Sequence, residues 1–68
     1  MRRPYVIYES YYSSTQHRVV KKLVADYYSE ETALDQYNML KDSGNIILEK
    51  SVGNHIYTWN EAHEEWEI

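Results

Sequence analysis

Tyrosines and basic residues lie close together in the first third of the chain, where their side chains could act on one ligand. The residues concerned are Tyr8, Tyr11, Tyr12, Arg18, Lys21 and Lys22. Aromatic rings stack on unpaired bases while cations follow phosphates, so this composition is typical of a surface that binds single-stranded nucleic acid. Glu9 and Asp26 lie in the same segments, however, and the net charge of the chain is −4. Because such binding depends on positive charge, nucleic-acid binding through Arg18, Lys21 and Lys22 is the alternative hypothesis.

The aromatic composition of the whole chain favours protein binding. There are eight tyrosines and two tryptophans among 68 residues, and no phenylalanine. A tyrosine joins a large apolar ring to a hydroxyl group that needs water or a partner, and protein interfaces are enriched in Tyr and Trp. The leading hypothesis is therefore a small module that binds another protein and carries out no chemistry.

The side chains that could support catalysis or metal binding are few. The histidines are His17, His55 and His63, and His63 has no second histidine at the spacing of a zinc-binding helix. The chain has no cysteine, which excludes disulfides and thiolate metal sites, and two glycines are too few for a nucleotide-binding loop. We expect no enzyme activity, no metal and no cofactor.

Acidic residues gather near the end of the sequence and offer a further hypothesis. Four carboxylates surround Trp66, at positions Glu61, Glu64, Glu65 and Glu67. Such a cluster can face a basic groove of a partner, including one that binds nucleic acid. Four carboxylates are few for a mimic of DNA, so this hypothesis stays secondary.

The elements that must position these residues can be read from apolar periodicity and turn signals. Residues Tyr5 to Tyr12 and His17 to Tyr28 are rich in Tyr, Val and Ile and read as two strands of a hairpin. A helix is expected over Ser29–Asp42, because Ser29 is a good N-cap and apolar residues follow at helical spacing. Gly44 stands where a left-handed C-terminal cap is expected.

The remaining residues predict two further hairpins. Asn45 to Val52 reads as a strand, and Gly53-Asn54 suits a type II′ turn, which would place Val52 opposite His55. The last segment, from Tyr57 to Ile68, resembles the second hairpin of streptococcal immunoglobulin-binding domains, in which two aromatic strands flank a six-residue loop. That resemblance covers about a dozen residues and implies a cross-strand pair of Trp59 and Trp66.

These elements predict an α+β fold in ββαβββ order. One antiparallel sheet of four to five strands carries one helix on one face, in one domain spanning residues 1–68. The sequence has neither the apolar stretch of a signal peptide nor the roughly 18 apolar residues of a membrane span, so we expect a cytoplasmic protein with no membrane contact.

One 14-residue helix cannot cover both faces of the sheet, and the first hairpin is apolar on both. Tyr5, Ile7 and Tyr11 alternate with Val6, Tyr8 and Tyr12, and strict alternation in the second strand would put Val19, Leu23, Ala25 and Tyr27 on one face. An exposed patch of this kind usually marks an interaction surface. The residues expected to bind the partner are Tyr8, Tyr11, Tyr12, Lys22 and Tyr28. A homodimer through the same hairpin remains open beside binding to a different protein.

In size, absence of cysteine and element order, the chain resembles small phage-encoded accessory proteins, among them anti-CRISPR and other inhibitors of host proteins. The residues that carry this resemblance are those from Tyr27 to Ala33, which enter the helix, and those from Gly53 to Trp59. The resemblance implies a bacterial host protein as partner, for example one that acts in defence or processes nucleic acid, and action in the host cytoplasm.

Overall fold

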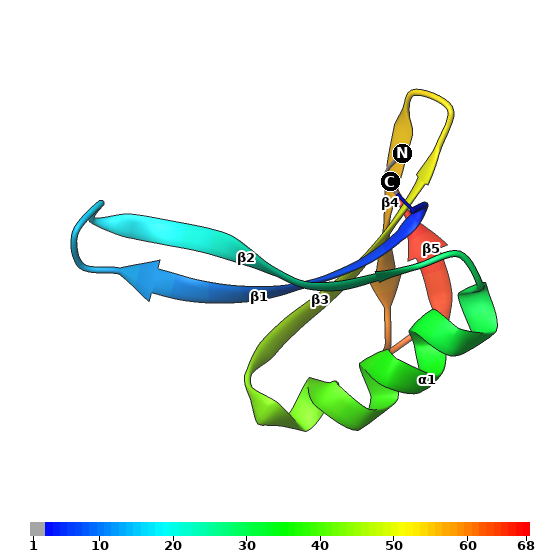
Figure 1. The fold of residues 1–68 in the computed structure, drawn as a ribbon, viewed down its shortest axis with the longest axis horizontal. Helices are drawn as coiled ribbons and strands as arrows, with labels where there is room; N and C mark the ends of the chain where they lie inside the picture. Colours follow the sequence, from blue (N-terminus) through cyan, green and yellow to red (C-terminus); the bar gives the residue numbers. More distant parts are fainter. Residues whose placement is uncertain (1–2) are drawn as a thin grey trace.

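The structure is a computed structural model that describes residues 3–68, so Met1 and Arg2 lie outside the described residues. It contains one antiparallel sheet with spatial strand order β2-β1-β3-β4-β5 and one helix, α1, packed on one face (Figure 1). The α+β class with a single antiparallel sheet and one helix is thus confirmed. The elements are β1 (Tyr5–Ser13), β2 (Arg18–Tyr27), α1 (Glu30–Leu40), a 3-10 turn (Lys41–Ser43), β3 (Asn45–Val52), β4 (His55–Asn60) and β5 (Glu65–Glu67).

Helix α1 begins where the capping residue predicts. The Ser29 hydroxyl accepts a hydrogen bond from the backbone N–H of Thr32 at 3.4 Å, and Glu30 and Glu31 stand in the first turn, where the helix dipole favours negative charge. The regular helix ends at Leu40, slightly earlier than expected, and the chain continues through the 3-10 turn.

The glycine after this turn has a different role from the one expected. Gly44 has φ 151° and ψ −159°, so it is not the left-handed cap that its position suggests. This backbone region is essentially restricted to glycine, because a Cβ atom would clash with the main chain. Glycine is therefore required at position 44, where the chain passes from the 3-10 turn into β3.

The core lies between α1 and the centre of the sheet. Ile7, Leu48 and Ala33 are fully buried and Tyr37 nearly so, while both tryptophans pack around them. We call the side of the sheet that carries Ile7 and Leu48 the helix-side face and the other side the open face. A core this small is close to the minimum for independent folding, since small domains bury a low fraction of their surface.

The β3–β4–β5 part of the sheet follows the expected register. Val52 pairs with His55, and Gly53 has φ 60° while the φ of Asn54 is negative, which fits a type II′ turn. Trp59 pairs with Trp66, and their rings meet edge to face with centroids 5.2 Å apart. The predicted pairing of Val52 with His55 and the predicted pairing of Trp59 with Trp66 are both confirmed.

The pairing of β2 with β1 departs from strict alternation. Ile7 lies opposite Ala25 but Tyr8 lies opposite Leu23, so Val24 is an extra residue that forms a β-bulge. The bulge separates two sets of residues that were expected to share one face. Ala25 and Tyr27 lie on the helix-side face, whereas Val19 and Leu23 lie on the open face, because one inserted residue reverses the alternation of the strand.

The hairpin of β1 and β2 extends beyond the rest of the molecule (Figure 1). Strand β3 pairs with β1 only from Tyr5 to Ser10, so the residues beyond, 11–20, have no third strand beside them. We call residues 11–20 the arm. The radius of gyration is 12.3 Å, against about 11 Å for a compact domain of this length.

The two ends of the described chain approach each other on the opposite side of the sheet from the arm (Figure 1). The rings of Tyr5 and Trp66 lie 6.0 Å apart, and the backbone N–H of Ser51 donates to the Pro4 carbonyl at 2.9 Å. Within residues 3–68, no helix is both long enough and apolar enough to cross a membrane.

Candidate interaction surfaces

The predicted partner-binding residues do not lie on one surface. Tyr11 and Lys22 pair with Val20 and Glu9 on the helix-side face, while Tyr8 and Tyr12 lie on the open face. Neighbouring side chains of a strand point to opposite sides, so adjacent residues such as Tyr11 and Tyr12 must separate. The expected single patch is therefore two surfaces, one on each face of the first hairpin.

Tyr28 belongs to neither of these surfaces. It follows the end of β2, and the guanidinium of Arg3 lies over its ring, 4.9 Å from the centroid. Arg3 also contacts the Asp26 carboxylate at 3.6 Å. Tyr28 is exposed, but it is engaged within the chain and lies away from the arm.

The helix-side surface includes a groove between β2 and the end of α1. It has a volume of about 360 Å³ and is lined by Leu23, Val24, Leu40 and Ile46, with Glu9, Lys22 and Ser43 at its polar edge. On the same face, the pair Tyr11–Val20 follows the pair Glu9–Lys22 toward the tip of the arm. Tyr11 is 46% exposed. An apolar groove with a few polar groups at its edge is the usual form of a site that receives side chains of a ligand.

The open-face surface is a stripe of apolar residues across three strands. Leu23, Tyr8 and Ile47 lie opposite one another on β2, β1 and β3, and Val19 lies opposite Tyr12 in the arm. Val19, Tyr12 and Leu23 are 65%, 62% and 55% exposed. We call these five residues the open-face stripe. Within the described part of the chain, α1 packs on the other face of the sheet. On this face the Lys21 ammonium lies over the Tyr8 ring, and Leu23, beside the bulge, also lines the helix-side groove.

The three basic residues of the alternative hypothesis are also divided between the faces. Arg18 and Lys22 lie on the helix-side face, and Lys21 lies on the open face, where it pairs with Ser10. The Lys21 ammonium contacts the Glu49 carboxylate at 2.9 Å and lies 4.6 Å from the centroid of the Tyr8 ring. One of the three cations is thus already paired, and no continuous basic stripe results.

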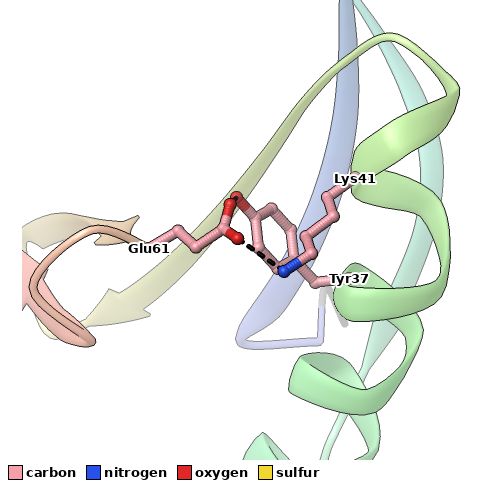
Figure 2. A network of polar contacts seen from close by, with 3 residues as sticks. All are labelled: Tyr37, Lys41 and Glu61. Carbon is pink, nitrogen blue, oxygen red and sulfur yellow. Dashed lines mark hydrogen bonds and ion pairs between the residues drawn. The ribbon is translucent and has the colours of Figure 1, made fainter.

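A second cleft lies between α1 and the β4–β5 loop. It has a volume of about 390 Å³, and Leu34 and Trp59 form its apolar side. At its edge Lys41 contacts the Glu61 carboxylate, and the Tyr37 hydroxyl donates to the same carboxylate at 3.5 Å (Figure 2). Because Tyr37 and Lys41 of α1 both contact Glu61, these three residues join the helix to the β4–β5 loop.

The polar surroundings of this cleft change the titration of two groups. Burial raises the pKa of the Tyr37 phenol above its ordinary value, and the negative charge of Glu61 raises it further. The hydrogen bond to Glu61 raises the pKa of Lys41. Both groups therefore hold their protons at neutral pH, which suits a structural contact and gives neither group the readiness of a general base.

Trp66, at the centre of the acidic end of the chain, faces the core. Trp66 packs on the core, and its indole Nε1 donates to Glu30 at 2.8 Å. Lys50 covers its ring at 4.6 Å from the centroid. Glu61 is held by Lys41, and Glu67 accepts a hydrogen bond from Asn60. Two of the four carboxylates that the sequence offered for a basic groove, Glu61 and Glu67, thus make contacts within the chain.

Sequence reasoning missed the residues that make the helix-side groove. Val24 shares the face of Lys22, as alternation predicts, but Leu40 and Ile46 reach the groove from elements that are distant in sequence. The doubled apolar pairs Val19-Val20 and Leu23-Val24 are the signal that could have indicated an irregular strand, because a regular half-buried strand alternates single apolar and polar residues. Among residues 3–68, no three His, Asp or Glu side chains gather in a way that could hold a metal ion.

Comparison of the chain with models of protein families, with characterised proteins and with solved structures gives no match.

Proposed function

We propose that this protein is a small binding module that engages a larger protein through the helix-side face of its arm and acts without catalysis. The observation that carries the proposal is the exposed Tyr11 beside a groove lined by Val24, Leu40 and Ile46. Exposed aromatic residues next to apolar hollows are typical centres of protein interfaces, where they contribute most of the binding energy.

The shape of the molecule supports the same function. The arm extends away from the helix and from β3, so it can enter a recess of a partner that a flat face could not reach (Figure 1). The helix-side face of the first hairpin carries Arg18 and Lys22, and all eleven Asp and Glu residues lie outside the segment from Ser10 to Ala25. A partner surface with an apolar centre and acidic edges fits this distribution.

The mode of action that follows is occlusion. A module of 68 residues that inserts an arm can block access to a functional surface of a much larger protein. A bacterial host protein as partner, and a phage as the origin of the chain, stay predictions drawn from the resemblance described above.

The proposal is tested by affinity capture from bacterial lysate with and without nuclease, followed by binding measurements on the captured protein. Tyr11→Ser is expected to weaken that binding at least about tenfold, because truncation of a central aromatic residue commonly has this effect. The matched control is Tyr12→Ser, which removes the neighbouring tyrosine from the opposite face. Equal loss in both variants, or unchanged affinity in a folded Tyr11→Ser variant, would assign the binding to another surface.

Nucleic-acid binding remains the second candidate, because Arg18, Lys21 and Lys22 lie in a segment free of acidic residues. Its support is weaker, since Lys21 is paired with Glu49 and lies on the other face from the remaining two. If phosphates are bound, the affinity for a single-stranded oligonucleotide should fall log-linearly with salt. Capture that disappears after nuclease treatment would favour this candidate.

A further inference from the structure

Strand β2 forms one edge of the sheet, and three of its residues, Lys22, Leu23 and Val24, line the helix-side groove. An edge strand directs half of its backbone N–H and C=O groups away from the sheet, where an extended chain can pair with them. We propose that the segment of the partner that contacts this protein is an extended, acidic strand that pairs with β2 along residues 18–22. This inference rests on the proposed function, because it specifies the chemistry of the partner that the helix-side face would bind.

The side chains of β2 on the helix-side face define the complementary sequence. In order along the strand they are Arg18, Val20, Lys22 and Val24, so positive and apolar residues alternate on this face. Side chains that lie opposite one another on neighbouring strands contact each other, and opposite charges stabilise such pairs. The partner segment is therefore expected to carry two acidic residues four positions apart, with one apolar residue midway between them and another at the same spacing beyond the second acid.

Each apolar residue of this segment would meet an apolar site on the helix-side face. The residue between the two acids would lie beside Val20, which pairs with the exposed Tyr11. The residue beyond the second acid would lie next to Val24, where the groove formed with Leu40 and Ile46 can receive its side chain. Backbone hydrogen bonds then supply affinity and the two apolar sites supply specificity, as in other complexes in which a peptide extends a sheet.

The positive charges on this face are available to a ligand. Arg18 and Lys22 are exposed, and within residues 3–68 neither lies at ion-pair distance from a carboxylate. The Nε of Arg18 donates to the side-chain oxygen of Gln16 at 3.0 Å, which leaves the terminal guanidinium nitrogens for a carboxylate. Lys21, by contrast, contacts Glu49 on the open face. The two cations of β2 that no carboxylate neutralises thus share the face on which the acidic residues are expected.

The charges also decide which strand can occupy this edge. A second copy of β2 would bring cations beside cations, and lysines on an edge strand are a usual means of preventing such self-association. The other edge strand, β5, has three residues, of which Glu65 and Glu67 are acidic, so it would repel an acidic segment. Of the two edges of the sheet, β2 is therefore the one that an acidic strand can approach.

The first test is a selection from a displayed library of random peptides of about twelve residues, carried out on the immobilised protein. We expect the enriched peptides to share acidic residues four positions apart with an apolar residue midway between them. Enriched peptides without acidic residues, or with apolar residues at helical spacing, would overturn the proposal, as would the absence of any enrichment.

The second test asks whether the synthesised consensus peptide binds as a strand. Methylation of alternate backbone nitrogens removes the donors along one edge of the peptide. One alternating set should weaken binding at least about tenfold, whereas the other set, which would face solvent, should have little effect. Hydrogen exchange of the outward amides of residues 18–22 should become slower in the complex. Equal effects of both methylated sets, or unchanged exchange, would show that no strand is added.

The third test is a charge reversal on the helix-side face. Lys22→Glu should weaken binding of the consensus peptide at least about tenfold, because it places like charges opposite each other. A peptide with Lys in place of the acid that faces Lys22 should bind this variant more tightly than the parent protein, which also shows that the variant is folded. Lys21→Glu is the matched control on the opposite face, and it should change the affinity less than about threefold. Equal losses in the two variants would contradict the assigned face.

The protein captured from lysate separates failure of this inference from failure of the proposed function. Its binding should fall in both Tyr11→Ser and Lys22→Glu, and the consensus peptide should displace it. Loss in Tyr11→Ser alone, without displacement by the peptide, would keep the helix-side site and overturn the acidic strand. Unchanged affinity in both folded variants would overturn the helix-side site itself.

Discussion

Trp66 and Glu30 are joined by a hydrogen bond of 2.8 Å from the indole Nε1 to the carboxylate, although 36 residues separate them in sequence. This contact ties the short strand β5 to the first turn of α1. It stands beside the edge-to-face contact of Trp66 with Trp59 and the contact with Tyr5. A strand of three residues contributes few backbone hydrogen bonds, so the side chain of Trp66 holds β5 in place.

Replacing Trp66 should therefore destabilise the whole protein. We expect Trp66→Ala to lower the free energy of unfolding by about 2 kcal/mol, because the half-buried ring loses two aromatic contacts and leaves a space beside the core. Trp66→Phe keeps most of the packing but not the indole N–H, and should have a smaller effect. Urea unfolding followed by circular dichroism measures both, and equal stability of the Ala variant and the parent would show that β5 is dispensable.

The burial of Tyr37, together with its contact with Glu61, predicts a loss of stability in alkali. The folded protein raises the pKa of Tyr37 above its ordinary value of 10.0, so above that pH the folded state binds a proton that the unfolded state has released. The stabilising contribution is complete below pH 10 and is lost as the pH rises through the higher folded pKa.

This pH dependence can be assigned to Tyr37 by substitution. The free energy of unfolding should fall less steeply above pH 10 in Tyr37→Phe than in the parent protein. Tyr12→Phe removes one phenol from an exposed position and serves as the control for the other tyrosines. Denaturant melts at several pH values give the slopes, and equal slopes for Tyr37→Phe and the parent would contradict the assignment.

Gly44 should tolerate no other residue without cost. Its φ of 151° lies where a Cβ atom is strained, while the space around it is open enough, since an added Cβ would meet only the Glu9 carboxylate at 3.5 Å. We expect Gly44→Ala to cost about 1–3 kcal/mol through the backbone alone. Ser43→Ala, at the preceding position, should change stability by less than about 0.5 kcal/mol. Thermal or urea unfolding measures the stability of both variants. An unchanged stability of Gly44→Ala would mean that the chain reaches β3 by another path.

The bulge predicts that the residue at position 24 can be deleted. Removal of Val24 would leave Leu23 opposite Tyr8 and Ala25 opposite Ile7, so the faces of β2 stay unchanged and the ladder becomes regular. We expect a folded protein that loses less than about 2 kcal/mol. Deletion of Ile47 from the regular strand β3 is the control, because it would turn Leu48 out of the core. NMR contacts between Tyr8 and Leu23 report the register directly.

Local features of the sequence predicted the parts of the fold that depend on local physics. Ser29 identified the start of α1, and Gly53-Asn54 fixed the register that brings Val52 opposite His55. In both places a few neighbouring residues determine the geometry, through a capping hydrogen bond or a two-residue turn. The cap at Gly44 was predicted by residue type but not by conformation, because the 3-10 turn that precedes it could not be seen from the sequence.

The candidate surfaces were predicted only in part. The tyrosines of the first hairpin were identified as exposed, and Tyr11 and Tyr12 are exposed. Their division between two faces follows from alternation, but the placement of Leu23 and Val19 depends on where the bulge lies. The groove needs Leu40 and Ile46 to meet Val24 across the sheet. Contacts of this kind arise from tertiary packing, which no short window of sequence contains.

The meeting of Tyr5 and Trp66 has a practical consequence for handling the protein. Both ends of the described chain leave the sheet on the side opposite to the arm (Figure 1). An affinity tag, a fluorophore or a second domain fused at either end would stand clear of the arm, so the protein can be immobilised by one end with its projecting hairpin directed into solution. The same proximity makes a circular permutant feasible, with a short linker joining the present ends and new ends opened at the exposed Gly53-Asn54 turn.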